Sequence, residues 1–141
     1  MLDDYQDLID ELLGTPALIR TLFATAGGTL PEESVAAVSA LHERDTIVLD
    51  RLQRLTREPS APYFKTLPPL DAAIAAAPIP DDPSDLLGSF DTARGDLVSL
   101  LMNLTLKDWE RIATDDVEGE ISLAEEVERH VEFDEAIRAR L

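Results

Sequence analysis

The 141-residue chain contains no cysteine. This absence excludes disulfide bonds, thiolate metal sites and cysteine nucleophiles together, and it is typical of a reducing compartment, so we expect a cytoplasmic protein. Histidine is almost as scarce, because the chain has only His42 and His130. A site that needs three imidazoles is therefore excluded as well.

Long apolar runs and basic residues are also scarce. No stretch of 18 apolar residues occurs, so we expect no membrane-spanning helix. The N-terminal segment is acidic where a signal peptide would be basic. Twelve basic residues stand against 29 acidic ones, for a net charge of −17. Such a chain repels phosphate backbones and anionic lipid, so we expect neither a nucleic-acid partner nor a membrane partner.

What the chain does contain is apolar residues at helical spacing. Hydrophobic residues make up 45% of the sequence, which is too many for a disordered chain. The length suits one domain over residues 1–141, and a chain of this size buries roughly two thirds of its unfolded surface. Four segments carry an apolar stripe at a period of 3.6 residues and predict helices over residues 3–26, 31–58, 84–103 and 122–141.

Several local signals refine these helices. Gly14-Thr15-Pro16 interrupts the first one, and whether it is one kinked helix or two is left open. Gly27-Gly28 ends it. A capped start of a short helix is predicted at Thr105 to Asp108, and this helix carries Trp109 and Ile112. A capping box for the last helix is predicted at Ser122 to Glu125.

The long connection over residues 57–83 holds seven of the nine prolines. Such density prevents a regular helix, although Asp71 to Ala77 can form a turn or two. A link of this length can travel along the molecule, so that the second and third helices run parallel. With no strand pattern in the chain, we expect an all-α four-helix bundle in an up-down-down-up order, without a sheet.

The segments LHERDTIVLDRLQRL (residues 41–55), FDTARGDLVSLLMNLTLKDWERI (90–112) and GEISLAEEVERHVEFDEAIRARL (119–141) follow one another in a characteristic order. In this order and spacing the chain resembles the DinB-like superfamily of bacterial four-helix bundles. The resemblance covers almost the whole chain. It implies the up-down-down-up topology and a homodimer.

Metal-binding members of that family carry one histidine on the second helix and a pair four residues apart on the fourth. The resemblance places Ala40, Phe133 and Ile137 at these positions, and none of the three side chains can bind a metal. The family's three-histidine site is therefore expected to be lost.

Two interpretations remain for four polar residues: Asp45, His130 and Asp134 on the helical seams, and His42 one position off the seam. The first is a displaced site for a divalent metal such as zinc, nickel, iron or manganese, since two imidazoles and two carboxylates suit these ions. The second, which we favour, is a polar layer in the core in which each histidine forms a hydrogen bond with an aspartate.

The expected function depends on whether these residues form a polar layer or a metal site. We expect a binding or assembly module, with no catalytic residue and no cofactor, whose partner is a second copy of the chain. The sequence leaves open whether it binds a small-molecule ligand. The alternative is a metal-dependent transferase or isomerase that handles a small thiol through the displaced site. A third hypothesis is an acidic module that docks a basic partner.

Overall fold

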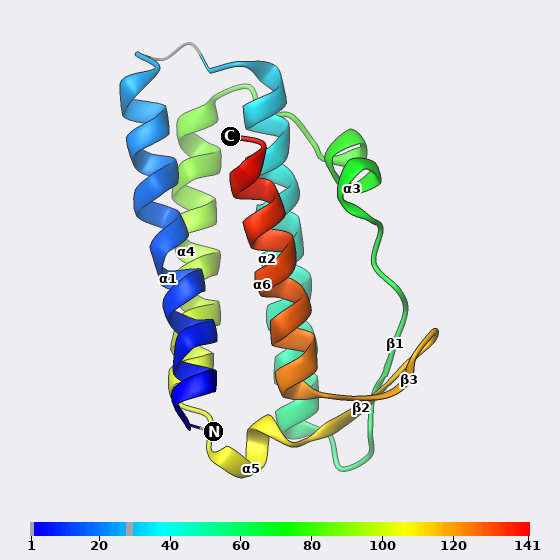
Figure 1. Ribbon diagram of the computed structural model, residues 1–141. Helices are drawn as coiled ribbons and strands as arrows, with labels where there is room; N and C mark the ends of the chain where they lie inside the picture. The colour runs from blue at the N-terminus through cyan, green and yellow to red at the C-terminus, as the bar shows by residue number, and fades with distance from the viewer. Residues whose placement is uncertain (1, 28–29) are drawn as a thin grey trace.

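The computed structural model describes residues 2–27 and 30–141, and four long helices dominate it (Figure 1). The first two of these helices lie on either side of the short gap in the description, and the other two occupy the second half of the chain. They are α1 (Leu2–Thr25), α2 (Glu32–Arg57), α4 (Pro83–Met102) and α6 (Leu123–Ala139). The chain is thus mostly helical, as the sequence predicts.

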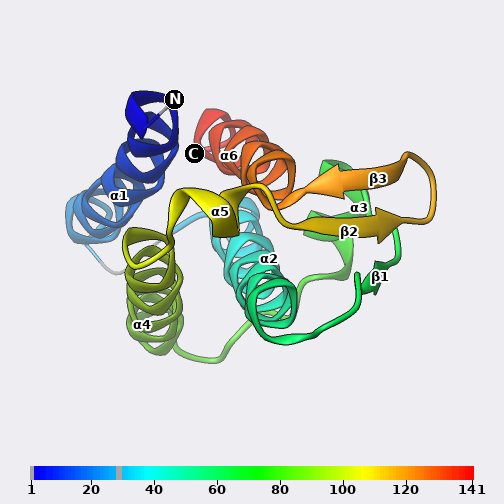
Figure 2. The same ribbon diagram turned by 90° about the horizontal axis from the view of Figure 1, so that it is seen from below.

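The long helices lie side by side, and each has one parallel and one antiparallel neighbour. In Figure 1, α1 and α6 run upward and α2 and α4 run downward. Seen from one end in Figure 2, α1 lies beside α4 and α6, and α2 lies beside the same two helices. The parallel course of α2 and α4 depends on residues 58–82, which run back along the outside of the molecule.

The first helix is continuous through Pro16, which answers the question that the sequence left open. Proline has no N–H, so the carbonyl of Leu12, four residues earlier, loses its helical partner. That carbonyl instead accepts a hydrogen bond of 2.8 Å from the guanidinium of Arg94 on α4. Past the end of α1, Gly27 has a φ of +60°, and Gly28, the other half of the predicted stop, lies outside the described residues.

The expectation of no sheet is wrong, because the described residues include a small three-stranded sheet. Its strands are β1 (Tyr63–Phe64), β2 (Ile112–Asp115) and β3 (Gly119–Ser122), in the order β1-β2-β3. The β1 strand pairs parallel with β2, and β2 pairs antiparallel with β3. Ile112, expected on a short helix, belongs to β2.

A tight turn explains the antiparallel pair. The carboxylate of Asp115 accepts hydrogen bonds from the backbone N–H groups of Val117 and Glu118, which closes the turn. Gly119 follows with a φ of +78°, a conformation that glycine adopts without strain. Strands of four residues and two residues are too short for an alternating pattern to be visible in the sequence.

Short elements cover the ends and one side of the long helices. The α5 helix (Leu106–Trp109) begins with the predicted capping box, and so does α6. Trp109 is buried and stacks on Tyr5, with ring centroids 4.4 Å apart. The α3 helix (Leu70–Ala76) forms where the sequence allowed a turn or two, and it packs against α2 and α6.

The core consists of two apolar clusters, one toward each end of the long helices. The cluster near α5 and the sheet includes Leu12, Val48 and Leu97. The other includes Ile19 and Phe90, among other residues. Where the two clusters meet, each long helix contributes at least one buried polar side chain.

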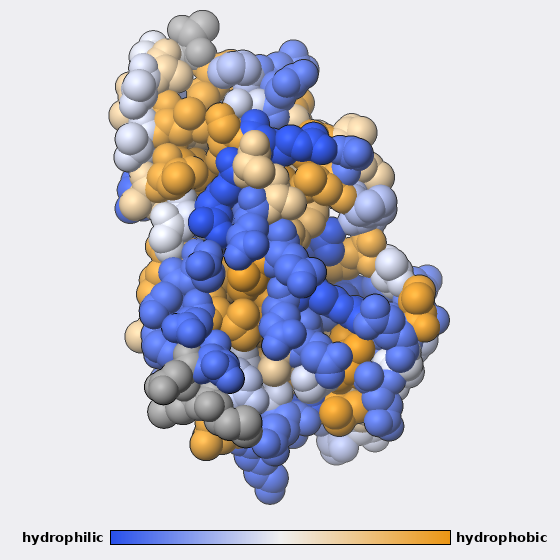
Figure 3. All heavy atoms as spheres, in the orientation of Figure 1, coloured by the Kyte–Doolittle hydropathy of each residue, from blue (hydrophilic) through white to orange (hydrophobic). Residues whose placement is uncertain are grey.

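The outside of the molecule is mainly hydrophilic on the face that carries α1 and α6. Figure 3 shows hydrophilic residues over most of the lower part of this face, and hydrophobic residues gathered toward its upper left. Among the described residues, no helix combines the length and the apolar character needed to cross a membrane.

Candidate functional site

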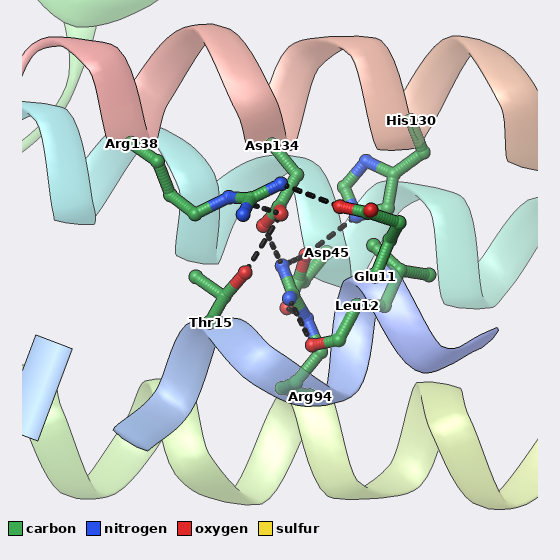
Figure 4. A network of polar contacts seen from close by, with 8 residues as sticks. All are labelled: Glu11, Leu12, Thr15, Asp45, Arg94, His130, Asp134 and Arg138. Carbon is green, nitrogen blue, oxygen red and sulfur yellow. Dashed lines mark hydrogen bonds and ion pairs between the residues drawn. The ribbon is translucent and has the colours of Figure 1, made fainter. Parts of the chain in front are cut away.

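A polar layer lies between the two apolar clusters, and every long helix contributes to it (Figure 4). The layer is buried, since each of its residues is at most 2% exposed. Its members are Thr15 from α1, Asp45 from α2, Arg94 from α4, and His130 and Asp134 from α6.

The guanidinium of Arg94 is the centre of this layer. Its Nε and Nη2 atoms donate to the two carboxylate oxygens of Asp45 at 2.8 and 2.9 Å. Nη2 also donates to Oδ1 of Asp134 at 2.8 Å, and Nη1 donates to the carbonyl of Leu12. One arginine thus links all four long helices, and it is held by two carboxylates that would repel each other without it.

The two carboxylates have further partners. Oδ1 of Asp45 lies 2.6 Å from Nε2 of His130. Oδ2 of Asp134 accepts a hydrogen bond of 2.7 Å from the hydroxyl of Thr15 and lies 3.2 Å from Nε of Arg138. Thr15, part of the segment that was expected to interrupt the first helix, therefore belongs to the polar layer.

Opposing effects set the protonation of this layer. Burial by itself raises the pKa of Asp45, but the hydrogen bond with His130 and the positive charge of Arg94 outweigh it and lower that pKa. For Arg94, burial alone lowers the pKa, yet Asp45 and Asp134 together raise it. The layer therefore holds an ionised Asp45 beside a permanent cation.

Three of the four predicted site residues come together, and the fourth does not. Asp45, His130 and Asp134 meet around Arg94, whereas His42 is half-buried in a depression between α2 and α4. The predicted polar layer has a hydrogen bond from each histidine to an aspartate. His130 has such a contact, with Asp45 of the neighbouring helix, whereas His42 has no aspartate partner among the described residues.

The residues that resemblance places at metal-ligand positions lie in the apolar core. Ala40, Phe133 and Ile137 are all buried in the cluster that also contains Phe90. Across residues 2–27 and 30–141, no group of three or more histidines and carboxylates has an arrangement that could hold a metal ion. Asp45 and Asp134 are both engaged by Arg94, which supplies the positive charge that a cation would otherwise bring.

Arg94 itself was missed by the sequence analysis, although a signal for it existed. It follows Phe90 by four residues and precedes Leu97 by three, so it occupies a position on the apolar stripe of its helix. A charged residue on a buried stripe needs opposite charges at the same depth, and Asp45 and Asp134 are the polar members of two other stripes.

A second feature adjoins the polar layer. A cavity of about 260 Å³ lies between α2, α6, the turn after β2 and the segment that follows β1, and His130 forms part of its wall. In Figure 2 the strands extend beside α2 and α6, so the sheet that the sequence did not predict supplies one side of it. Its lining residues are Arg44, Val48, Arg51, Thr66, Leu67, Asp115, Val117, Glu118, Glu126, Arg129 and His130.

Charged groups dominate the cavity wall. Arg51 donates to Oε1 of Glu126 at 2.9 Å, and its guanidinium lies 4.7 Å from the centre of the Phe64 ring. Arg129 donates to Asp115 at 3.1 Å. Three of the twelve basic residues of this acidic chain therefore surround one small space.

Arg44 differs from the other two arginines of the wall. Its Nη2 atom donates to the carbonyl of Pro68 at 2.7 Å, and its guanidinium lies 4.0 Å from the centre of the Phe133 ring. No carboxylate of the described residues lies within ion-pair distance of it. Burial, followed by repulsion from Arg51, lowers the pKa of Arg44, and Glu126 offsets only part of this effect.

Two residues of this wall each have a buried side-chain atom without a hydrogen-bond partner among the described residues. These atoms are Oε2 of Glu126 and Nδ1 of His130, from side chains that are 3% and 2% exposed. The two residues are four positions apart on α6 and so lie on the same face of the helix. Because buried polar atoms in proteins nearly always have partners, such a pair beside a cavity indicates a place where a ligand or water donates hydrogen bonds.

A short contact with Asp45 orients His130. Asp45 is held ionised, so the 2.6 Å contact requires Nε2 of the imidazole to carry a hydrogen. Nδ1 is the ring nitrogen without a partner among the described residues. Asp45 and Arg94 thus fix the position of a histidine that also lines the cavity.

Comparison of the chain with protein-family models, with curated proteins and with solved structures found no match.

Proposed function

We propose that this chain is a DinB-like four-helix bundle with up-down-down-up topology, that it has lost the family's three-histidine metal site, and that it binds a small polar molecule. The order of the sequence motifs and the directions of the long helices support the family assignment. The observation that carries the binding function is the cavity with its two unpartnered buried acceptors, Oε2 of Glu126 and Nδ1 of His130.

The size of the cavity limits the ligand. Pockets for drug-sized molecules measure roughly 300–1,000 Å³. At about 260 Å³ this cavity suits a smaller molecule, and its wall of arginines, carboxylates and an imidazole suits a polar one. A rigid protein wall that is already hydrogen-bonded loses little entropy on binding, which favours a preformed site.

Two-dimensional NMR of isotope-labelled protein against a library of small amines, carboxylates, amino acids and sugars tests this proposal. We expect at least one compound to shift the signals of residues that line the cavity. Glu126→Gln should weaken that binding, whereas Glu128→Gln, the same change at an exposed position of α6, should not. A library in which no compound shifts cavity signals would contradict the proposal.

A metal-dependent enzyme that handles a small thiol is the alternative, and the polar layer argues against it. Arg94 already neutralises Asp45 and Asp134, and His42 lies elsewhere. Elemental analysis of protein purified without a histidine tag separates the two proposals. We expect no stoichiometric zinc, nickel, iron or manganese. One equivalent of metal that is lost in His130→Ala would favour the enzyme.

Assembly into a homodimer is compatible with ligand binding, and one surface favours it. Leu13 and Met102 are 48% and 64% exposed, and together with Val98 they line a groove between α1 and α4. Exposed apolar side chains that gather in this way are typical of protein interfaces. Sedimentation equilibrium should report a dimer that Met102→Glu weakens, and a wild-type monomer at all concentrations would exclude it.

A further inference from the structure

The cavity wall offers two kinds of binding group, and they point to ligand groups of opposite charge. On α6, Oε2 of Glu126 and Nδ1 of His130 both accept hydrogen bonds, so they require a donor. On α2, Arg44 is a permanent cation without a carboxylate partner in the described part of the chain, so it favours an anion.

We propose that the cavity binds a small amino acid as a zwitterion, with its ammonium group on Glu126 and His130 and its carboxylate on Arg44. This inference rests on the proposed binding function and names the ligand class. An ammonium group has three hydrogens, which suffices for both acceptors. A guanidinium presents two parallel N–H donors that match the two oxygens of a carboxylate. Among the described residues, the guanidinium of Arg44 donates one hydrogen bond, to the carbonyl of Pro68.

The charges already present in the wall agree with a ligand that is neutral overall. Arg51 is paired with Glu126, and Arg129 with Asp115 and Glu118, so three basic side chains face three acidic ones. A ligand with a net charge would disturb this balance in a partly buried space, where unpaired charges are costly. A zwitterion brings one charge of each sign and leaves the balance unchanged.

Contacts within the wall and with residues behind it hold its geometry. Arg51 is fixed by Glu126, by the carbonyl of Lys65 and by the ring of Phe64. His130 is fixed by Asp45. The acceptor pair therefore has little freedom, and such preorganisation makes the binding sensitive to the spacing of the two ligand charges.

Isothermal titration with a matched ligand series tests the inference on the wild-type protein. The zwitterions are glycine, β-alanine, γ-aminobutyrate and 5-aminovalerate, which separate the two charges by increasing lengths. Butyrate lacks the ammonium group and butylamine lacks the carboxylate. We expect one zwitterion to bind at least about tenfold more tightly than either of them, a difference of about 1.4 kcal/mol.

Variants assign the two ends of the ligand. Arg44→Gln should weaken the best zwitterion about tenfold or more and leave butylamine unchanged, and Glu126→Gln should weaken the zwitterion and leave butyrate unchanged. Arg20→Gln and Glu128→Gln make the same changes at exposed positions away from the cavity and should have no effect. Thermal melts of each variant establish that it is folded.

The outcomes separate the two proposals. Butyrate or butylamine binding as tightly as every zwitterion would overturn the zwitterion inference. It would also be overturned if no amino acid bound while a library compound of another class shifted cavity signals, and in that case the binding function would stand. If no compound of either set bound at the cavity, both proposals would fail.

Discussion

At the scale of single residues, the most consequential side chain is Arg94. It is 1% exposed, bonded to two carboxylates and to a backbone carbonyl, and it joins helices that are far apart in the sequence. A buried ion pair contributes less to stability than its geometry suggests, because both charges lose their hydration. Removing one member is nevertheless costly, since the remaining charges stay buried without a partner.

Replacement of Arg94 should therefore destabilise the protein strongly. Arg94→Met keeps much of the side-chain volume and leaves Asp45 and Asp134 facing each other. We expect a loss of about 3–5 kcal/mol in the free energy of unfolding, measured by urea titration. Arg20→Met, which removes an exposed partner of Asp91, should cost less than about 1 kcal/mol. Similar losses for both variants would show that Arg94 is not the centre of the layer.

The lowered pKa of Asp45 predicts a dependence of stability on pH. Its ordinary value is 3.8, and the folded-state pKa lies below this. The ionised carboxylate thus stabilises the fold above pH 3.8, and this contribution is lost as the pH falls through the lowered pKa.

A comparison of variants isolates that contribution. We expect Asp45→Asn to be less stable than the wild type between about pH 5 and 7, with a difference that narrows below about pH 4. Asp50→Asn, at an exposed position of the same helix, controls for the loss of one negative charge. A difference that stays constant down to about pH 2 would contradict the assignment.

At the scale of secondary structure, α1 shows how one helix depends on another. A proline in the interior of a helix costs about 3 kcal/mol or more, partly through the lost hydrogen bond. In this protein the carbonyl that Pro16 leaves free is bonded by Arg94. The hydrogen bond from Arg94 on α4 therefore replaces the one that Pro16 removes from α1.

A double-mutant cycle measures this compensation. In Pro16→Ala the new N–H can bond the carbonyl of Leu12, so Arg94→Met should cost less in that background than in the wild type. We expect a coupling of about 1 kcal/mol, the usual contribution of one hydrogen bond. Effects of proline on the unfolded chain cancel in the cycle. A coupling near zero would mean that the bond from Arg94 to Leu12 contributes nothing.

At the scale of the whole molecule, the net charge of −17 governs association. Most acidic residues are on the surface, while three arginines are gathered around the small cavity and another lies in the core. The buried charged side chains include acids as well as bases, so most of the net negative charge lies on the outside of the molecule. A surface of this kind repels polyanions. Salt at about 0.1 M screens this repulsion beyond a distance of about 10 Å.

The protein should bind neither DNA nor RNA at physiological salt, because binding to nucleic acid depends on cations that neutralise phosphates. Fluorescence anisotropy with duplex and single-stranded oligonucleotides at micromolar protein checks this. A basic DNA-binding domain under the same conditions serves as a positive control. Binding that weakens steeply as salt is added would refute the prediction.

The sequence by itself determined which segments form the long helices and which faces they bury. The stripes of α2 and α6 were read correctly, including Asp45, His130 and Asp134 as their polar members, because a period of 3.6 residues is a local property. Both capping boxes were also found, since each involves residues only three positions apart.

Tertiary structure alone decided how these polar residues are paired. Asp45 contacts His130 and Arg94 because their helices meet at one depth, and no spacing along one helix contains that information. The sheet escaped prediction for a similar reason, since β1 lies about 50 residues before its partner β2 and is two residues long. The cavity is formed by that sheet together with α2 and α6, so it too depends on contacts between distant segments.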